Sequence, residues 1–246
     1  KIIYTIIPLW SSFLMGNSST DHLFKKAVTA YDQGNFEEAI EIYTHLIDKK
    51  EGRGDIYYNL GNAYYRNGQI GLSMASFLAA RKLMPRNPNV KANLNFVHEK
   101  TKDRLKIDLP QDFLSIVGFW IDQSTPREIM LITIFFWCIG FLILILCLFW
   151  TNLSQLKIAG KSMIGTSLIF SVAFTISYIK QESWGAVIIQ KAKVHSSPGD
   201  HATILFELKQ GSPFVLERSE KDWYKIVLSD GQKGWISKRE SKVFEI

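Results

Sequence analysis

The side chains that could carry out chemistry are few and lie far apart. The five histidines are scattered, and only His195 and His201 share a loop, with no third ligand at a spacing that would complete a metal site. Cys138 and Cys147 lie in one apolar run, at a spacing that points them to opposite faces of a helix. No phosphate-binding loop, paired carboxylates or HExxH motif is present. We therefore expect no catalytic site, metal or cofactor, and we do not expect an enzyme.

Two further features could attract a ligand through charge. Arg53-Gly54-Asp55 has the letters of an adhesion tripeptide, but it lies between two helical segments, where glycine and aspartate are ordinary turn residues. The net charge of +6 is spread thinly along the chain instead of forming a basic patch. We interpret these charges as solvated surface and expect no nucleic-acid partner.

What remains is a set of side chains suited to binding, carried by a repeated helical pattern. Within residues 55–85 the apolar and small residues fall at the intervals of two short helices joined by a tight turn. A shift of about 34 residues superposes Ala27 on Gly61 and Gly34 on Gly68. The shift reveals an internal repeat, and the small residues would let paired helices approach closely.

This segment resembles tetratricopeptide (TPR) repeats. The run from Asn59 to Tyr65 matches the first helix of the repeat, and Ser73, Phe77, Ala80 and Pro85 match the second. The first repeat matches less closely, because Lys50-Glu51 stands where the closing proline is usual. We expect an all-α TPR domain over 19–106, closed by a capping helix from about Pro88 to Leu105.

The resemblance implies that ligands lie in the concave groove lined by the first helices. Tyrosine walls, an asparagine to meet a peptide backbone and flanking cations suit an extended peptide or a partner's loop. The alternative is that Tyr58 and Tyr65 only fill space in the helix stack, whereas Tyr57 and Tyr64 are expected to face neighbouring helices. The groove residues implied are Val28, Tyr31, Tyr58, Asn62, Tyr65, Arg66, Phe96 and Lys100. A chaperone-type carboxylate clamp is not expected, since its cationic positions fall on Phe24, Asn89 and Asn93.

An uncharged run over 129–150 is long enough to cross the roughly 30 Å bilayer core. Thr125, Pro126 and Glu128 before it have the types of a helix start, with a cap, a first-turn proline and a returning carboxylate. We expect a transmembrane helix over 127–150, preceded by an interfacial linker over 107–126.

A second, shorter apolar run predicts a transmembrane helix over 163–180 and hence a membrane hairpin. Its small residues Gly165, Ser167, Ser171 and Ala173 could pack against the first span. The intervening loop over 151–162 carries Lys157 and Lys161 and no acid, which favours the cytoplasm.

The first residues also bear on topology. Residues 1–18 combine a basic residue, a short apolar stretch and small polar residues, which is typical of a signal peptide. A retained anchor, or a buried first strand or helix, is the alternative. With the lysine loop inside, both soluble parts are expected on the exported, periplasmic side of a bacterial cytoplasmic (inner) membrane.

The last part of the chain, 184–246, changes to short alternating segments separated by turn residues, which predicts a small all-β barrel. Asp230-Gly231 marks a hairpin within "DWYKIVLSDGQKGWI". This region resembles the bacterial SH3-like family, and the resemblance implies a ligand surface formed by exposed aromatics. The candidates are Trp223, Tyr224 and Trp235. The alternative is that these rings form the core, because a small barrel needs all its apolar area.

The order of these segments over the whole chain resembles the BatE-like family of the Bacteroides aerotolerance operon. The resemblance implies a membrane assembly with von Willebrand-type protein partners, linked to stress tolerance and envelope integrity. Our interpretation is a non-catalytic, membrane-tethered adaptor that binds a protein partner in the TPR groove. The alternative is a cell-wall sensor or accessory factor whose SH3-like domain binds peptidoglycan.

Overall fold

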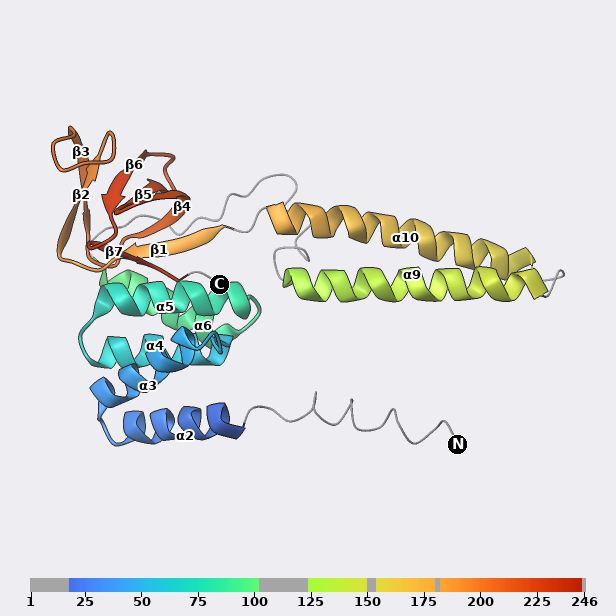
Figure 1. Cartoon of the computed structure of the whole chain (residues 1–246), viewed down its shortest axis with the longest axis horizontal. Coiled ribbons are helices and arrows are strands. Elements are labelled where there is room, and N and C mark those ends of the chain that lie inside the picture. Colours follow the sequence, from blue (N-terminus) through green and yellow to red (C-terminus); the bar gives the residue numbers. More distant parts are fainter. Residues whose placement is uncertain (1–17, 102–123, 150–153, 180–181, 245–246) are drawn as a thin grey trace. The chain divides into compact units, whose positions relative to one another are not determined.

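The structure is a computed structural model, and it describes residues 18–101, 124–149, 154–179 and 182–244. The chain divides into two compact units, of which one holds the helical repeats with the β-sheet and the other holds two long apolar helices (Figure 1). The predicted signal segment over 1–18 and most of the predicted linker over 107–126 lie outside the described residues. The predicted fold class is confirmed: helical repeats, two apolar helices and a C-terminal antiparallel sheet.

The repeats consist of two helix pairs that follow one another with the same turn geometry. In each pair the joining turn contains a glycine at positive φ, +83° at Gly34 and +77° at Gly68, a conformation that glycine adopts without steric cost. The residue after each glycine closes the turn in the same way, since Asn35 N–H donates to Ala30 O and Gln69 N–H to Tyr64 O. The helices are α2 (Ser18–Asp32), α3 (Phe36–Asp48), α4 (Gly54–Arg66) and α5 (Ile70–Leu83).

The close approach predicted at Gly61 is present. A methyl group on Gly61 would lie 2.8 Å from the ring of Phe77, which is itself 1% exposed. The hydroxyl of Ser73 donates to the carbonyl oxygen of Gly61 at 2.8 Å, so α5 also contacts the backbone of α4. Only a residue without a side chain allows the two helices this separation.

The first repeat ends without the usual proline. Lys50 adopts a φ of +59°, and Glu51 N–H donates to Leu46 O, which is the helix-closing pattern normally found with glycine. The capping helix α6 (Pro88–Lys100) begins at Asn87, whose side chain accepts from the N–H groups of Asn89 and Val90. Its inner face is buried through Val90, Leu94 and Val97.

The C-terminal sheet has seven strands in the order β3-β2-β6-β5-β4-β1-β7, and every recorded pairing is antiparallel. The predicted hairpin at Asp230-Gly231 is confirmed: Leu228 N–H donates to Gln232 O and Gly231 has φ +85°. The strands are β1 (Ser183–Val187), β2 (Lys191–His195), β3 (Ile204–Lys209), β4 (Pro213–Glu220), β5 (Trp223–Val227), β6 (Lys233–Ser237) and β7 (Ser241–Val243).

The sheet is not a separate body from the repeats. Strands β1 and β7 contact α5, and Ala186 of β1 belongs to the same buried cluster as Met74, Phe77 and Leu94. Figure 1 shows β1 running alongside α5. The repeats and the barrel therefore share hydrophobic core.

The second unit is a pair of antiparallel helices, α9 (Pro126–Phe149) and α10 (Ser154–Ile179). Each is long and apolar enough to cross a membrane, by length and composition. The predicted start of the first is confirmed by a reciprocal cap, in which Thr125 N–H donates to Glu128 Oε2 at 2.8 Å and Glu128 N–H donates to Thr125 Oγ1 at 3.3 Å.

Two details of the predicted hairpin are wrong. The loop expected over 151–162 is mostly helix, because α10 begins at Ser154 and lysine is a good helix former, so Lys157 and Lys161 extend from its first turns. Gly165 does not pack against α9, since no atom lies within 4 Å of a methyl group placed there. The close approach is instead made by Gly140 against Ile164 and by Gly160 against Leu144, while Ser167 and Ala173 are buried.

Candidate binding surfaces

The first candidate surface is the predicted TPR groove, defined here by the facing side chains of α4 and α6. Asn93 of α6 links the two helices, because its Nδ2 donates to Asn62 Oδ1 at 2.8 Å and to the Tyr58 hydroxyl at 3.2 Å. Within the described residues, this arrangement leaves Asn93 Oδ1 as an acceptor and Asn62 Nδ2 and the Tyr58 O–H as donors. A peptide backbone presents the complementary pair, one N–H and one C=O.

An aromatic pair lies one turn further along the same two helices. The rings of Tyr65 and Phe96 meet edge to face at 5.3 Å between centroids, and the ammonium of Lys100 lies 5.5 Å from the Phe96 ring. Phe96 is 46% exposed, which is high for a phenylalanine on a helix that packs on a core. An apolar side chain of a ligand could cover this ring, with an acidic group beside Lys100.

Two of the other predicted groove residues, Tyr31 and Arg66, lie in a separate cluster around Phe36. The guanidinium of Arg66 lies 4.9 Å above the ring of Phe36, and that ring meets Tyr31 edge to face at 5.4 Å. Val28 is half-buried on α2. Tyr31 and Arg66 therefore lie apart from the groove between α4 and α6. Asn93, which the sequence indicated only as an unfilled clamp position, and Phe36 were not among the predicted groove residues.

The second candidate surface lies on the barrel, where alternation along β5 and β6 separates the three predicted aromatics. Trp223 pairs with Ser237 and Lys225 pairs with Trp235, so the two tryptophans lie diagonally on one face. Tyr224 points the other way, packs against the barrel core and is covered by Lys238 at 5.0 Å. A ligand on the outer face would therefore contact the tryptophans and not Tyr224.

Trp223 also lines a cavity of about 370 Å³ that no single motif predicted. The rings of His195 and Trp223 meet edge to face, with 5.2 Å between their centroids. A contact of 3.0 Å between His195 Nδ1 and Ala202 O fixes the position of the imidazole. The cavity mixes aromatic, cationic and acidic groups, and its walls are Lys193, His195, Asp200, Ile204, Trp223, Ser237, Arg239 and Glu240. His195 belongs to this site because β2 pairs with β6 at Trp235, a contact invisible in the sequence.

The edge of this face is charged. Glu217 of β4 accepts from Lys225 at 2.7 Å and from Lys233 at 3.1 Å, and these hydrogen bonds, Lys225 first, lower the pKa of the Glu217 carboxyl. The carboxylate lies at the surface, so the three charges chiefly shape the local potential at the rim of the tryptophan face.

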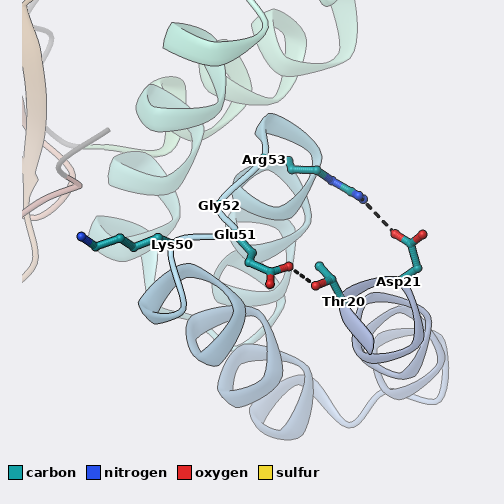
Figure 2. Close-up of a pocket in the computed structure, with 6 residues that line it drawn as sticks. All are labelled: Thr20, Asp21, Lys50, Glu51, Gly52 and Arg53. Atoms are coloured by element: carbon teal, nitrogen blue, oxygen red, sulfur yellow. Dashed lines mark hydrogen bonds and ion pairs between the residues drawn. The ribbon is translucent and has the colours of Figure 1, made fainter. Parts of the chain in front are cut away.

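A third hollow, of about 290 Å³, lies where the start of α2 meets the turn between α3 and α4. Figure 2 shows Arg53 reaching across it to Asp21, and the Thr20 hydroxyl bonded to Glu51, while Lys50 points away. Arg53 also binds Asp55 at 2.9 Å. The cation and the acid of the Arg53-Gly54-Asp55 sequence are therefore paired with each other, which argues against an adhesion role.

Over the four described stretches of the chain, no group of three or more histidine, cysteine, aspartate or glutamate side chains could hold a metal ion. His195 and His201 belong to no such group among the described residues. The candidate surfaces are composed of aromatic rings, amide groups and charged side chains.

Comparison with known proteins agrees with this architecture. Residues 191–242 match the family described as bacterial SH3 domain, residues 29–68 match TPR repeat, and residues 54–86 match tetratricopeptide repeat. The chain carries TPR repeats and a bacterial SH3 domain. Both are domain types that are typically non-catalytic.

Among curated proteins the chain is similar to the Photosystem I assembly protein Ycf3 of Prochlorococcus marinus, strains NATL1A and NATL2A. Each is 26% identical over 104 residues, which is 41% of this chain. The chain spans 58% of the length of these relatives.

Proposed function

We propose that the protein is a non-catalytic, membrane-tethered scaffold that holds a protein partner in its TPR groove. The observation that carries the proposal is the linked set of Tyr58, Asn62 and Asn93 beside the exposed ring of Phe96. The two amides and the Tyr58 hydroxyl offer one acceptor and two donor groups, which suit an extended backbone, and the exposed ring of Phe96 suits an apolar side chain next to it. The partner we infer is an extended segment with an apolar residue and a nearby acid.

Membrane topology is the second part of the proposal. Because the barrel shares core with the repeats, both must lie on the same side, and two membrane-crossing helices return the chain to the side it left. Lys157 and Lys161, exposed on the first turns of α10, favour the cytoplasm for the connection between the helices. We therefore propose that the repeats and the barrel are periplasmic.

This topology predicts the outcome of reporter fusions in a bacterial host. A periplasmic reporter fused at Lys106 or at Ile246 is expected to be active, and a cytoplasmic reporter is expected to be active only near Lys157, because lysines are retained on the inner side. Cytoplasmic activity at Ile246 contradicts the topology.

The assembly to which the scaffold belongs is proposed from the domain order. TPR repeats, two membrane helices and a bacterial SH3 domain occur in the order of the BatE-like family of the aerotolerance operon, which supports von Willebrand-type membrane proteins as partners. The curated relatives are assembly proteins by name, which is consistent with a scaffold but names no partner here.

The groove is tested with a paired substitution on α6 of the full chain in its native membrane. Crosslinking and mass spectrometry identify the partner of the natural chain, and Asn93→Ala with Phe96→Ala is expected to lower the yield of that crosslink at least about tenfold. Both residues are half-buried or exposed, so the variant should fold normally. Lys91→Ala with Asn95→Ala, on the opposite flank of the same helix, is the matched control and should keep the partner.

A partner retained by the Asn93 and Phe96 variant excludes the groove as the binding surface.

The second candidate function, binding of peptidoglycan by the barrel, is favoured by the cavity beside Trp223 and His195. In that case the detergent-solubilised full chain should bind purified sacculi saturably, and Trp223→Ala should abolish this binding while the groove variant leaves it unchanged.

A further inference from the structure

Helix α5 is buried on all sides. The neighbouring helices of the repeats alone would leave one of its faces in solvent. Nine of its residues, Gly71 and every residue from Ser73 to Ala80, are buried. A helix on the outer layer of a repeat stack normally keeps one polar, solvated face. The face of α5 opposite α4 and α6 must therefore be covered by something else, and within the described residues the cover is the barrel.

The contact is closest at the start of α5. A methyl group on Gly71 would overlap the carbonyl oxygen of Val187 and lie 2.6 Å from the Cα of Ile188. A methyl group on Gly211, which has a φ of +83°, would lie 2.4 Å from Cγ2 of Thr101, the residue that follows α6. Gly71 thus permits a backbone-to-backbone contact between the modules that any side chain would prevent, and Gly211 leaves room for the Thr101 side chain.

Aromatic side chains complete the contact along the two modules. The guanidinium of Arg81 lies 5.1 Å above the ring of Trp184, so β1 runs along α5 in the opposite direction. Phe244, beyond β7, meets the 3%-exposed Tyr57 of α4 edge to face at 5.2 Å and packs against both helical clusters.

We infer that the TPR repeats and the barrel are one composite domain, in which the β1–β7 edge is the fixed partner of α5 and α4. The membrane segment is then an insertion into this domain, and the regions 19–106 and 184–246 do not fold as independent modules. A barrel docked in this way cannot act as a mobile arm that searches the cell wall. The inference concerns folding and does not rest on the proposed partner.

The test is hydrogen exchange measured by mass spectrometry on the full chain in nanodiscs. Gly71→Ala raises helix propensity, so any loss of protection must come from the blocked contact. We expect amides of β1, β7 and α5 to exchange at least about tenfold faster in this variant. Gly165→Ala, the same change in α10 where no atom lies within 4 Å, should leave exchange in all three elements unchanged.

A second variant acts from the barrel side. Phe244→Ala should increase exchange in α4 and α5, although the substitution lies outside both helices. Trp235→Ala is its control, because it truncates a large ring on the outer face of the barrel and should leave α4 and α5 protected. Unchanged α5 exchange in both the Gly71 and Phe244 variants, or separate unfolding of the repeats and the barrel, overturns the inference.

Discussion

Gly61→Leu is expected to lower the free energy of unfolding of the domain that contains the helical repeats by about 3 kcal/mol, at the upper end of the usual range for overpacking. The reason is geometric. Even a methyl group on Gly61 lies 2.8 Å from the Phe77 ring, and Phe77 has no room to move because its own ring is buried. The leucine would also push α5 away from the carbonyl oxygen of Gly61, to which Ser73 donates. Thermal unfolding followed by circular dichroism measures the effect.

Two further variants show whether the loss comes from this contact. Phe77→Ala alone should cost about 3 to 5 kcal/mol through the cavity it leaves. Combined with Gly61→Leu, the leucine can occupy part of that cavity, so the double variant should be more stable than the sum of the single losses by about 1 kcal/mol or more. Strict additivity, or a Gly61→Leu variant with an unchanged melting point, means that the two residues do not meet as described.

The repeat architecture could be predicted because its signals are local. Gly34 and Gly68 must adopt positive φ in equivalent turns, and Gly61 must lack a side chain where Phe77 packs. Each requirement leaves a recognisable residue at a fixed spacing. The hairpin at Asp230-Gly231 was predictable for the same reason, since the turn itself demands those residue types.

The existence of the two long apolar helices could be predicted from the sequence, but their bounds and packing could not. Apolar length alone indicates a span, whereas the start of α10 depended on whether Lys157 and Lys161 belong to a loop or to a helix, and lysine is compatible with both. The packing of α9 against α10 was harder to predict than their bounds. Gly140 and Gly165 are equally small, and only the rotation of each helix decides that Gly140 faces its neighbour and Gly165 does not.

The contact between the repeats and the barrel left no signal that a single sequence could reveal. Trp184 and Phe244 have the appearance of ordinary barrel-core residues, and the helical residues they contact lie far away in the chain, across the two apolar helices. The one indirect clue was the composition of α5, which has no polar face of the usual width. Asn93 was missed similarly, because its role depends on facing Asn62 from another helix.

The last prediction compares two adjacent tyrosines of α4. Tyr64 packs against the core formed by α2, α3 and α4, and burial raises the pKa of its hydroxyl, with a hydrogen bond to Thr44 acting in the opposite direction. Tyr65, about 100° further round the helix, lies against the exposed Phe96 at the groove. Tyr65 also packs against the buried cluster that contains Phe77 and Leu94. The same truncation therefore removes core packing at both positions, but at Tyr65 part of the lost contact is with a solvent-exposed ring.

We expect Tyr64→Ala to cost about 3 kcal/mol, the lower end of the range for a packed aromatic, since the ring is only partly buried. Tyr65→Ala should cost less, about 2 kcal/mol, because part of its contact is with Phe96, a ring half in solvent, and the rest is with the edge of a buried cluster. Urea unfolding of the two variants, followed by circular dichroism, gives the comparison directly, and each variant serves as the control for the other. Tyr65→Ala combined with Arg66→Ala should still fold and should lose the crosslinked partner. Equal losses of stability at Tyr64 and Tyr65 would mean that both rings support the helix stack, and the groove would then have to bind through Asn62, Asn93 and Phe96 without an aromatic wall from α4.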